Sequence, residues 1–245
     1  MTTIETLERE LLYNSNDPVM VGMVPVYPVT IREIRRMGYA RYKGLLGILC
    51  LTPEDISVLL DDPSSPGVPL YFLISILELK ENQRDDILDA FRMVCHDTVT
   101  WDVQSMEIRL GDGVLNTENF PVFQTVIRER NKMLNKEVDS DDNPADERTK
   151  ALLAKSRELE AKRSKARDGD DSGVTLADLV SICAAKLCVH PDAIGEYDMY
   201  QLNDVLGRFK MFEDYETNIS ALLHGAKKED VDLRHWISGN QSLFD

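Results

Sequence analysis

The chain has 245 residues, a length that corresponds to one or two domains. Its 43% hydrophobic and 29% charged residues are the composition of an ordinary globular protein with enough apolar material for a sizeable core. The net charge of -15 argues against broad, sequence-independent binding of nucleic acid, because such binding depends on lysine and arginine neutralising phosphates. A basic or apolar partner surface is expected instead.

Membrane insertion and disulfide bonds are not expected either. The apolar run at residues 71–79 is far shorter than a membrane span and is typical of a buried helix. The four cysteines lack a disulfide-framework pattern, and the first residues do not have the pattern of a signal peptide. We therefore expect free thiols and a reducing, cytoplasmic compartment. The cysteines are Cys50, Cys95, Cys183 and Cys188.

The chain begins with a predicted helix and an extended segment. Residues 1–17 have the apolar spacing of a short amphipathic helix. Residues 19–29 have strand composition but contain Pro25 and Pro28, and proline cannot donate to a strand ladder. This segment is therefore predicted to be an edge strand or an extended arm. An arm that packs on a neighbouring molecule would let the protein self-associate.

Five helices are expected next. Thr30 and Glu33 form a capping-box pattern that opens the first, and Thr52 followed by Pro53 is a strong start for the third. The second contains Gly44 and Gly47, which weaken a helix but allow another backbone to come close. The predicted ranges are 30–37, 39–51, 53–60, 68–79 and 84–96.

A small β-hairpin is predicted after these helices. The residues at 101–103 and 106–110 alternate between apolar and polar, and Gly111-Asp112-Gly113 is a turn sequence that leads into Val114-Leu115. The segment at residues 111–113 lacks the Walker pattern of phosphate-binding loops and the full set of ligands of a calcium-binding loop. A turn is therefore favoured over a phosphate or calcium site. A helix is then expected from Asn119 to about Asn135.

The remaining residues divide into a linker and a second helical unit. Residues 136–173 are charged, poor in large apolar side chains and typical of a flexible or helical linker. Residues 174–245 carry two helical patterns. The first, at 176–187, is opened by Thr175 and Asp178, and the second, at 199–222, is opened by Asp198 and Gln201. The sequence thus predicts a mainly α protein with an N-terminal domain at 1–135, a linker at 136–173 and a C-terminal interaction unit at 174–245.

No catalytic or metal-binding constellation stands out. The nearest to a metal pattern is Cys183, Cys188 and His190, but zinc sites usually have closer cysteine spacing and a second ligand pair. Cys183 lies on an apolar helical stripe, where a free cysteine behaves as a small hydrophobic residue. We therefore expect no metal, no cofactor and no enzymatic activity.

Two further segments have alternative interpretations. The basic residues at 162–167 could contact nucleic acid, although acidic residues on both sides favour an exposed, solvated helix. Trp236 lies close to Arg234 beyond a charged break, and both residue types are common interface anchors. Trp236 either folds back to cap the C-terminal unit or belongs to a docking segment.

Three stretches, taken together, resemble a known family. They are YPVTIREIR at 27–35 with Met37-Gly38-Tyr39 and Tyr42, YQL at 200–202 with Arg208-Phe209 and then GAK at 225–227, and DLRHW at 232–236. Their order is similar to that in tail assembly chaperones of tailed bacteriophages from Gram-positive hosts. The resemblance covers both ends of the chain, about half of it, and the motifs are degenerate.

The resemblance implies a non-enzymatic role in tail assembly. Such chaperones coat the tape measure protein and recruit tail tube subunits, so these two proteins are the expected partners, and the cytoplasm of the infected host is the expected location. We predict partner contacts through seven residues. They are Tyr200, Leu202, Arg208, Phe209, Phe212, Arg234 and Trp236. A head–tail connector or neck protein of the virion is one alternative, and a small regulatory or nucleic-acid-associated protein is another.

Overall fold

The fold is mainly α, as predicted from the sequence. The computed structural model describes residues 11–60, 67–132, 174–227 and 231. The predicted N-terminal helix falls largely outside these ranges, and the predicted linker falls entirely outside them. The division into domains at 1–135, 136–173 and 174–245 therefore stays a prediction.

Helices α2 to α7 of the N-terminal body begin close to their predicted starts. Thr30 caps α2 by accepting a hydrogen bond from the Glu33 backbone, and the Glu33 side chain returns one to Thr30. Helix α7 ends earlier than the predicted Asn135, because Asn131 already leaves the helix and Lys132 has a φ of 50°. The bounds are α2 Ile31–Met37, α3 Tyr39–Leu49, α4 Pro53–Leu60, α5 Pro69–Leu79, α6 Glu81–Cys95 and α7 Phe120–Arg130.

The strands form two small antiparallel sheets. The first is a hairpin of β1 (Val19–Val21) and β2 (Val24–Val26), so the segment predicted as an edge strand or an arm is an edge hairpin. The second has β3 (Val99–Asp102), β4 (Glu107–Leu110) and β5 (Gly113–Leu115) in that order. The predicted hairpin, which turns at Gly111-Asp112-Gly113 into Val114-Leu115, is formed by β4 and β5, and a further turn at residues 103–106 adds β3 as a third strand.

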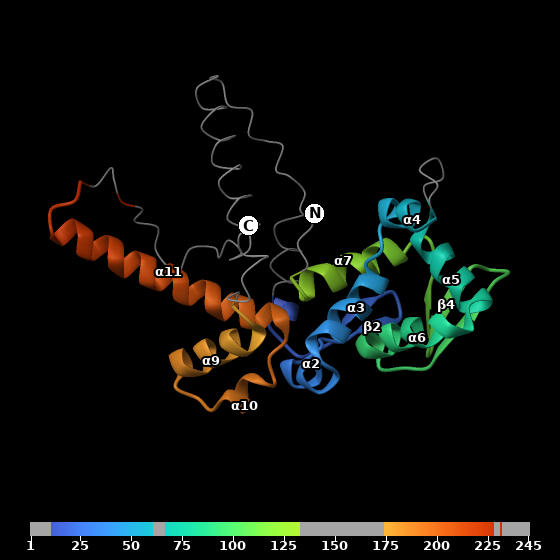
Figure 1. Cartoon of the computed structure of the whole chain (residues 1–245), viewed down its shortest axis with the longest axis horizontal. Coiled ribbons are helices and arrows are strands. Elements are labelled where there is room, and N and C mark those ends of the chain that lie inside the picture. Colours follow the sequence, from blue (N-terminus) through green and yellow to red (C-terminus); the bar gives the residue numbers. More distant parts are fainter. Residues whose placement is uncertain (1–10, 61–66, 133–173, 228–230, 232–245) are drawn as a thin grey trace, which may run out of the picture.

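Helix α6 is central to the core of this body. It packs between α3 and α5 and also contacts β2 and β3, while α7 covers the β1–β2 hairpin (Figure 1). The two sheets meet where β5 contacts β2. A Cβ on Gly113 would lie 2.6 Å from a methyl carbon of Val24 and 2.8 Å from the Met23 carbonyl oxygen. Only a residue without a side chain permits this close approach.

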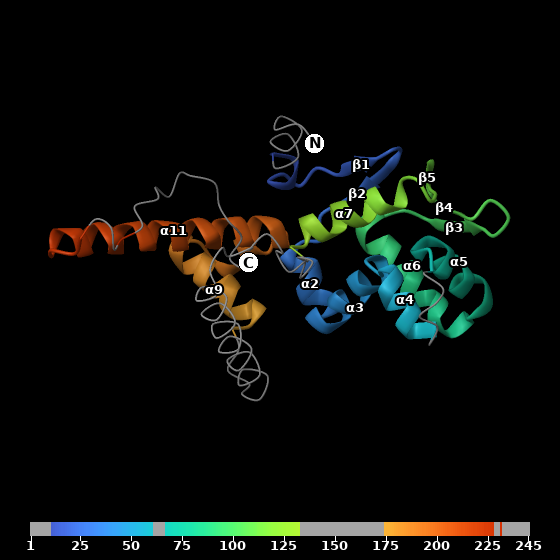
Figure 2. The same cartoon turned by 90° about the horizontal axis from the view of Figure 1, so that it is seen from above.

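The C-terminal unit consists of α9 (Leu176–Leu187), the short α10 (Pro191–Ile194) and the long α11 (Met199–Leu223). Predicted capping boxes open two of these helices, with Thr175 and Asp178 at α9 and Asp198 and Gln201 at α11. Helix α9 packs on the first half of α11, and the second half of α11 projects away from the N-terminal body (Figures 1 and 2).

The C-terminal unit is joined to the start of α2 by backbone hydrogen bonds. The amide of Ile31 donates to the Tyr197 carbonyl at 2.7 Å, and that of Arg32 donates to the Gly195 carbonyl at 2.9 Å. The first amides of a helix have no partner within the helix. Here residues 195–197 supply acceptors for two of them, so the start of α2 is completed by a segment more than 160 residues later in the chain.

A buried ion pair reinforces this junction. The Arg130 guanidinium donates to Asp198 Oδ2 at 3.1 Å, and both side chains are 1% exposed. The two terminal nitrogens of Arg130 donate to backbone carbonyl oxygens, Nη1 to that of Asp17 at 3.0 Å and Nη2 to that of Ser15 at 2.7 Å. Asp198 also accepts the backbone amide of Gln201 at 2.8 Å, as the cap of α11. Arg130 thus connects the N-terminal segment, α7 and the start of α11.

The environment of Asp198 sets the energetic role of this pair. Burial raises the pKa of the Asp198 carboxyl above its ordinary value, against the opposing effects of the Gln201 amide and the Arg130 guanidinium. Because removing both charges from water is costly, such a pair adds little net stability, but breaking it leaves one buried charge uncompensated. The pair therefore specifies how the two units fit together.

Replacing Arg130 tests this account. The Arg130→Met variant should lose about 3–5 kcal/mol of unfolding free energy at neutral pH, because Asp198 is left buried without a counter-charge. The loss should shrink as the pH falls, since Asp198 then takes up a proton in the folded state. The measurement is urea unfolding followed by circular dichroism at several pH values.

Two variants serve as controls. Arg130→Met combined with Asp198→Asn should be more stable than Arg130→Met alone, because asparagine keeps the helix cap and removes the charge. Arg35→Gln removes an ion pair with Asp192 that also bridges the two units, at 3.1 Å, but is solvent-exposed. Its cost should be at most about 1 kcal/mol. Equal losses for Arg35→Gln and Arg130→Met would contradict the account.

Candidate functional site

Two of the predicted partner-binding residues take part in the fold itself. Leu202 is fully buried in the hydrophobic core, so it is not available to another protein. Tyr200 is half-buried at the junction, with its ring centroid 5.2 Å from that of Tyr13 and the Lys132 ammonium 4.2 Å from the ring centroid. These contacts explain why an apolar and aromatic pattern begins at the start of α11.

Three other predicted residues lie further along α11. Arg208 is exposed and forms an ion pair with Asp204 at 3.3 Å, one helical turn earlier. Phe209 is half-buried, and Phe212 is 41% exposed, which is unusual for so large an apolar side chain. Arg234 and Trp236 lie outside the described residues. Arg208, Phe209 and Phe212 therefore form the described part of the predicted binding surface.

The cysteine–histidine pattern at residues 183–190 is divided among separate structural roles. Cys183 is fully buried in the core, whereas Cys188 is exposed and ends α9 in a left-handed conformation with a φ of 54°. His190 caps α10 by accepting the Asp192 amide. Within the described ranges, no three histidine, cysteine or acidic residues are grouped to hold a metal ion.

The turn at residues 111–113 also has a structural explanation. Gly111 has a φ of 56°, and a Cβ there would lie 2.1 Å from a carboxylate oxygen of Asp97. The turn joins β4 to β5 and packs Gly113 against β2, which accounts for both glycines without a ligand. The basic residues at 162–167 lie outside the described part of the chain.

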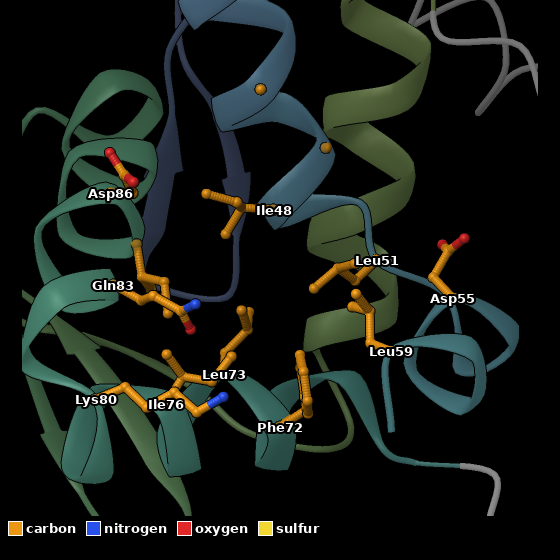
Figure 3. Close-up of a pocket in the computed structure, with 13 residues that line it drawn as sticks. Ile48, Leu51, Asp55, Leu59, Phe72, Leu73, Ile76, Lys80, Gln83 and Asp86 are labelled. Atoms are coloured by element: carbon orange, nitrogen blue, oxygen red, sulfur yellow. The ribbon is translucent and has the colours of Figure 1, made fainter. Parts of the chain in front are cut away.

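Sequence reasoning did not predict a groove on the N-terminal body. It has a volume of about 910 Å³ and is bounded by α3, α4, α5 and α6. Figure 3 shows Ile48, Leu51 and Leu59 pointing into a shared space, with Asp86 and Asp55 on opposite sides of it. The other lining residues are Gly44, Gly47, Phe72, Leu73, Ile76, Lys80, Gln83 and Ile87.

The end of α3 beside this groove is held in place by α7. The Gln124 side chain donates to the carbonyl oxygens of Leu49 and Leu51, both at 2.9 Å, and Arg128 donates to that of Cys50 at 2.7 Å. The last carbonyls of a helix lack partners within it, so these bonds satisfy them and fix the direction of α3. The sequence signal for the groove was the glycine pair in α3.

Part of the chain matches a known protein family. Residues 163–240 match the family described as YomV second domain, a phage-derived family, which is consistent with a phage protein. The match begins in the predicted linker and includes α9, α10 and α11. No curated protein and no solved structure matches the chain. Among the described helices, none combines the length and apolar character needed to span a bilayer.

The cysteines provide a test of these environments. Burial raises the pKa of the Cys50 thiol to about 11 and that of Cys95 to about 12, and burial also raises the pKa of Cys183. Because the thiolate is the reactive form, these three should resist iodoacetamide at neutral pH in the native protein. The exposed Cys188 should be alkylated first, as read by mass spectrometry of peptides.

Unfolding in urea before alkylation is the control, because all four cysteines should then react at similar rates. Native labelling of Cys50 or Cys95 as fast as that of Cys188 would mean that the core opens readily or is packed differently.

Proposed function

We propose that this protein is a non-enzymatic phage tail assembly chaperone that binds the tape measure protein and tail tube subunits. The proposal is supported by the resemblance at residues 27–42, 200–209 and 225–236, and by the phage-derived family match at 163–240, which overlaps the last two stretches. A role in the cytoplasm of the infected host, before the virion is complete, belongs to the same proposal.

The binding surface that we propose lies along α11 from Arg208 onward. The end of this helix projects away from the N-terminal body (Figure 2), and Phe212, 41% exposed, follows the exposed Arg208 by one helical turn. An exposed aromatic residue one helical turn from an arginine is a common form of interface anchor. A helix face of this kind suits a long helical partner, which can lie alongside it.

The absence of enzymatic activity is also part of the proposal. It is supported by the protonated, buried state of Cys50 and Cys95 and by the structural roles of Cys188 and His190. Each of these side chains is accounted for by packing or helix capping. The proposal thus assigns the chemistry of the protein to recognition of other proteins.

Co-expression with the tape measure protein of the same phage genome tests the proposal. We expect the tape measure protein to be insoluble alone and to be recovered in a soluble complex when this protein is present. The double variant Arg208→Ala and Phe212→Ala should recover at least about tenfold less complex, since truncating interface anchors typically costs 2 kcal/mol or more. The measurement is affinity co-purification with quantified bands.

Lys210→Ala is the matched control, because Lys210 is an exposed residue of the same helix. It should recover as much complex as the unmodified chain. Failure to recover any complex, with closed rings of this protein seen by electron microscopy, would overturn the chaperone assignment in favour of a connector. Salt-sensitive binding to DNA would instead favour a regulatory role through residues 162–167.

A further inference from the structure

Helix α3 has two apolar sides, and only one of them faces the core. Tyr42, Leu45, Leu46 and Leu49 are buried. On the opposite side, Gly44, Gly47 and Ile48 follow one another at helical spacing and are continued by Leu51 just beyond the helix. Positions separated by three, four and seven residues share one face of a helix. This second side forms one wall of the groove in Figure 3.

The two glycines keep that wall flat. A Cβ placed on Gly44 or Gly47 would meet no atom within 4 Å among the described residues. Neither residue has the positive φ that favours glycine, and glycine is one of the least favourable residues inside a helix. Packing within the described chain therefore does not explain them. Their effect is to leave room for another backbone to come close to α3.

The groove is open and apolar along its floor. Gly44 and Gly47 are exposed, and Leu59 at its edge is 62% exposed. Phe72 and Ile76, on α5, form the opposite side. An open channel with aliphatic side chains on facing helices has the form of a site that receives an amphipathic helix. An enclosed pocket would better suit a small molecule.

Charges at the rim indicate the chemistry of the occupant. Asp55 and Asp86 carry carboxylates on opposite sides of the groove (Figure 3), and Lys80 is the one basic residue among the described residues that line it. Arg41 lies 4.0 Å from Asp86 but donates its hydrogen bond to Asp89 at 2.7 Å. With a net charge of -15, the whole chain also attracts basic partners.

We propose that this groove binds an amphipathic helix of a partner protein. The apolar stripe of that helix lies against Gly44, Gly47 and Ile48, and its lysine or arginine residues face Asp55 and Asp86. The groove lies on the N-terminal body, away from the surface of α11 and outside residues 163–240. The proposal therefore does not depend on the tail-assembly role and stands or falls separately from it.

The test uses the full-length chain and a fluorescein-labelled synthetic peptide of leucine and lysine with helical apolar spacing. Fluorescence anisotropy should show saturable binding, and a scrambled peptide of the same composition should bind at least about tenfold more weakly. Gly47→Leu should weaken binding of the helical peptide by about tenfold or more, because the added side chain fills the space beside α3. Gly47→Ala adds only a methyl group and should retain binding.

The rim is tested with a pair of charge-matched variants. Asp86→Lys and Asp85→Lys change the net charge equally, but Asp86 lines the groove and Asp85 does not. Asp86→Lys should weaken binding several-fold more than Asp85→Lys does. This pair also keeps the test valid if Gly47→Leu fails to fold, which circular dichroism would reveal.

Three outcomes would overturn the proposal. The first is equal binding of the helical and scrambled peptides. The second is unchanged binding by Asp86→Lys relative to Asp85→Lys, which would place the peptide elsewhere on the acidic surface. The third is a dimer of the unmodified chain in sedimentation velocity that Gly47→Leu dissociates, since the occupant would then be a second copy of this chain.

Discussion

The buried pair of Arg130 and Asp198 is the constraint on which the arrangement of this protein depends. Arg130 also holds the carbonyl oxygens of Ser15 and Asp17, so one guanidinium connects three distant segments. Asp198 in turn caps α11 and pairs with Thr30 at the start of α2. A buried charge allows few alternative positions, because every displacement leaves it unpaired. The direction of α11 is therefore fixed by α7 and α2.

That direction separates the groove from the end of α11. The groove lies among α3, α4, α5 and α6, whereas α11 extends away from the N-terminal body (Figure 1).

Local features of the fold could be predicted from the sequence. The capping boxes at Thr30, Thr175 and Asp198 are confirmed, because a cap depends only on residues within one helical turn. The hairpin that turns at Gly111-Asp112-Gly113 into Val114-Leu115 was predicted, but the reversal at residues 103–106 that separates β3 from β4 was not. The end of α7 was placed too late because the chain turns at Asn131 and Lys132, where no proline or glycine marks the end of the helix.

Long-range contacts could not be predicted in the same way. Nothing in the sequence around Arg130 indicates that its ion-pair partner lies 68 positions further along the chain. The hydrogen bonds from the Ile31 and Arg32 amides to residues 195–197 likewise join segments that are far apart in the sequence. The groove was missed for a related reason. The two glycines in α3 indicated that another backbone could come close to this helix. The sequence does not say whether that backbone belongs to the same chain or to another molecule. In the structure, no described atom occupies that space.

Hydrogen–deuterium exchange of the full-length chain, alone and with the tape measure protein, tests the central claim most directly. That claim is that this protein acts by binding another protein through the projecting part of α11. The account predicts slower exchange in residues 208–223 on addition of the partner, with no change in the sheet at residues 99–115. Unchanged exchange throughout α11 in the presence of a stable complex would contradict it.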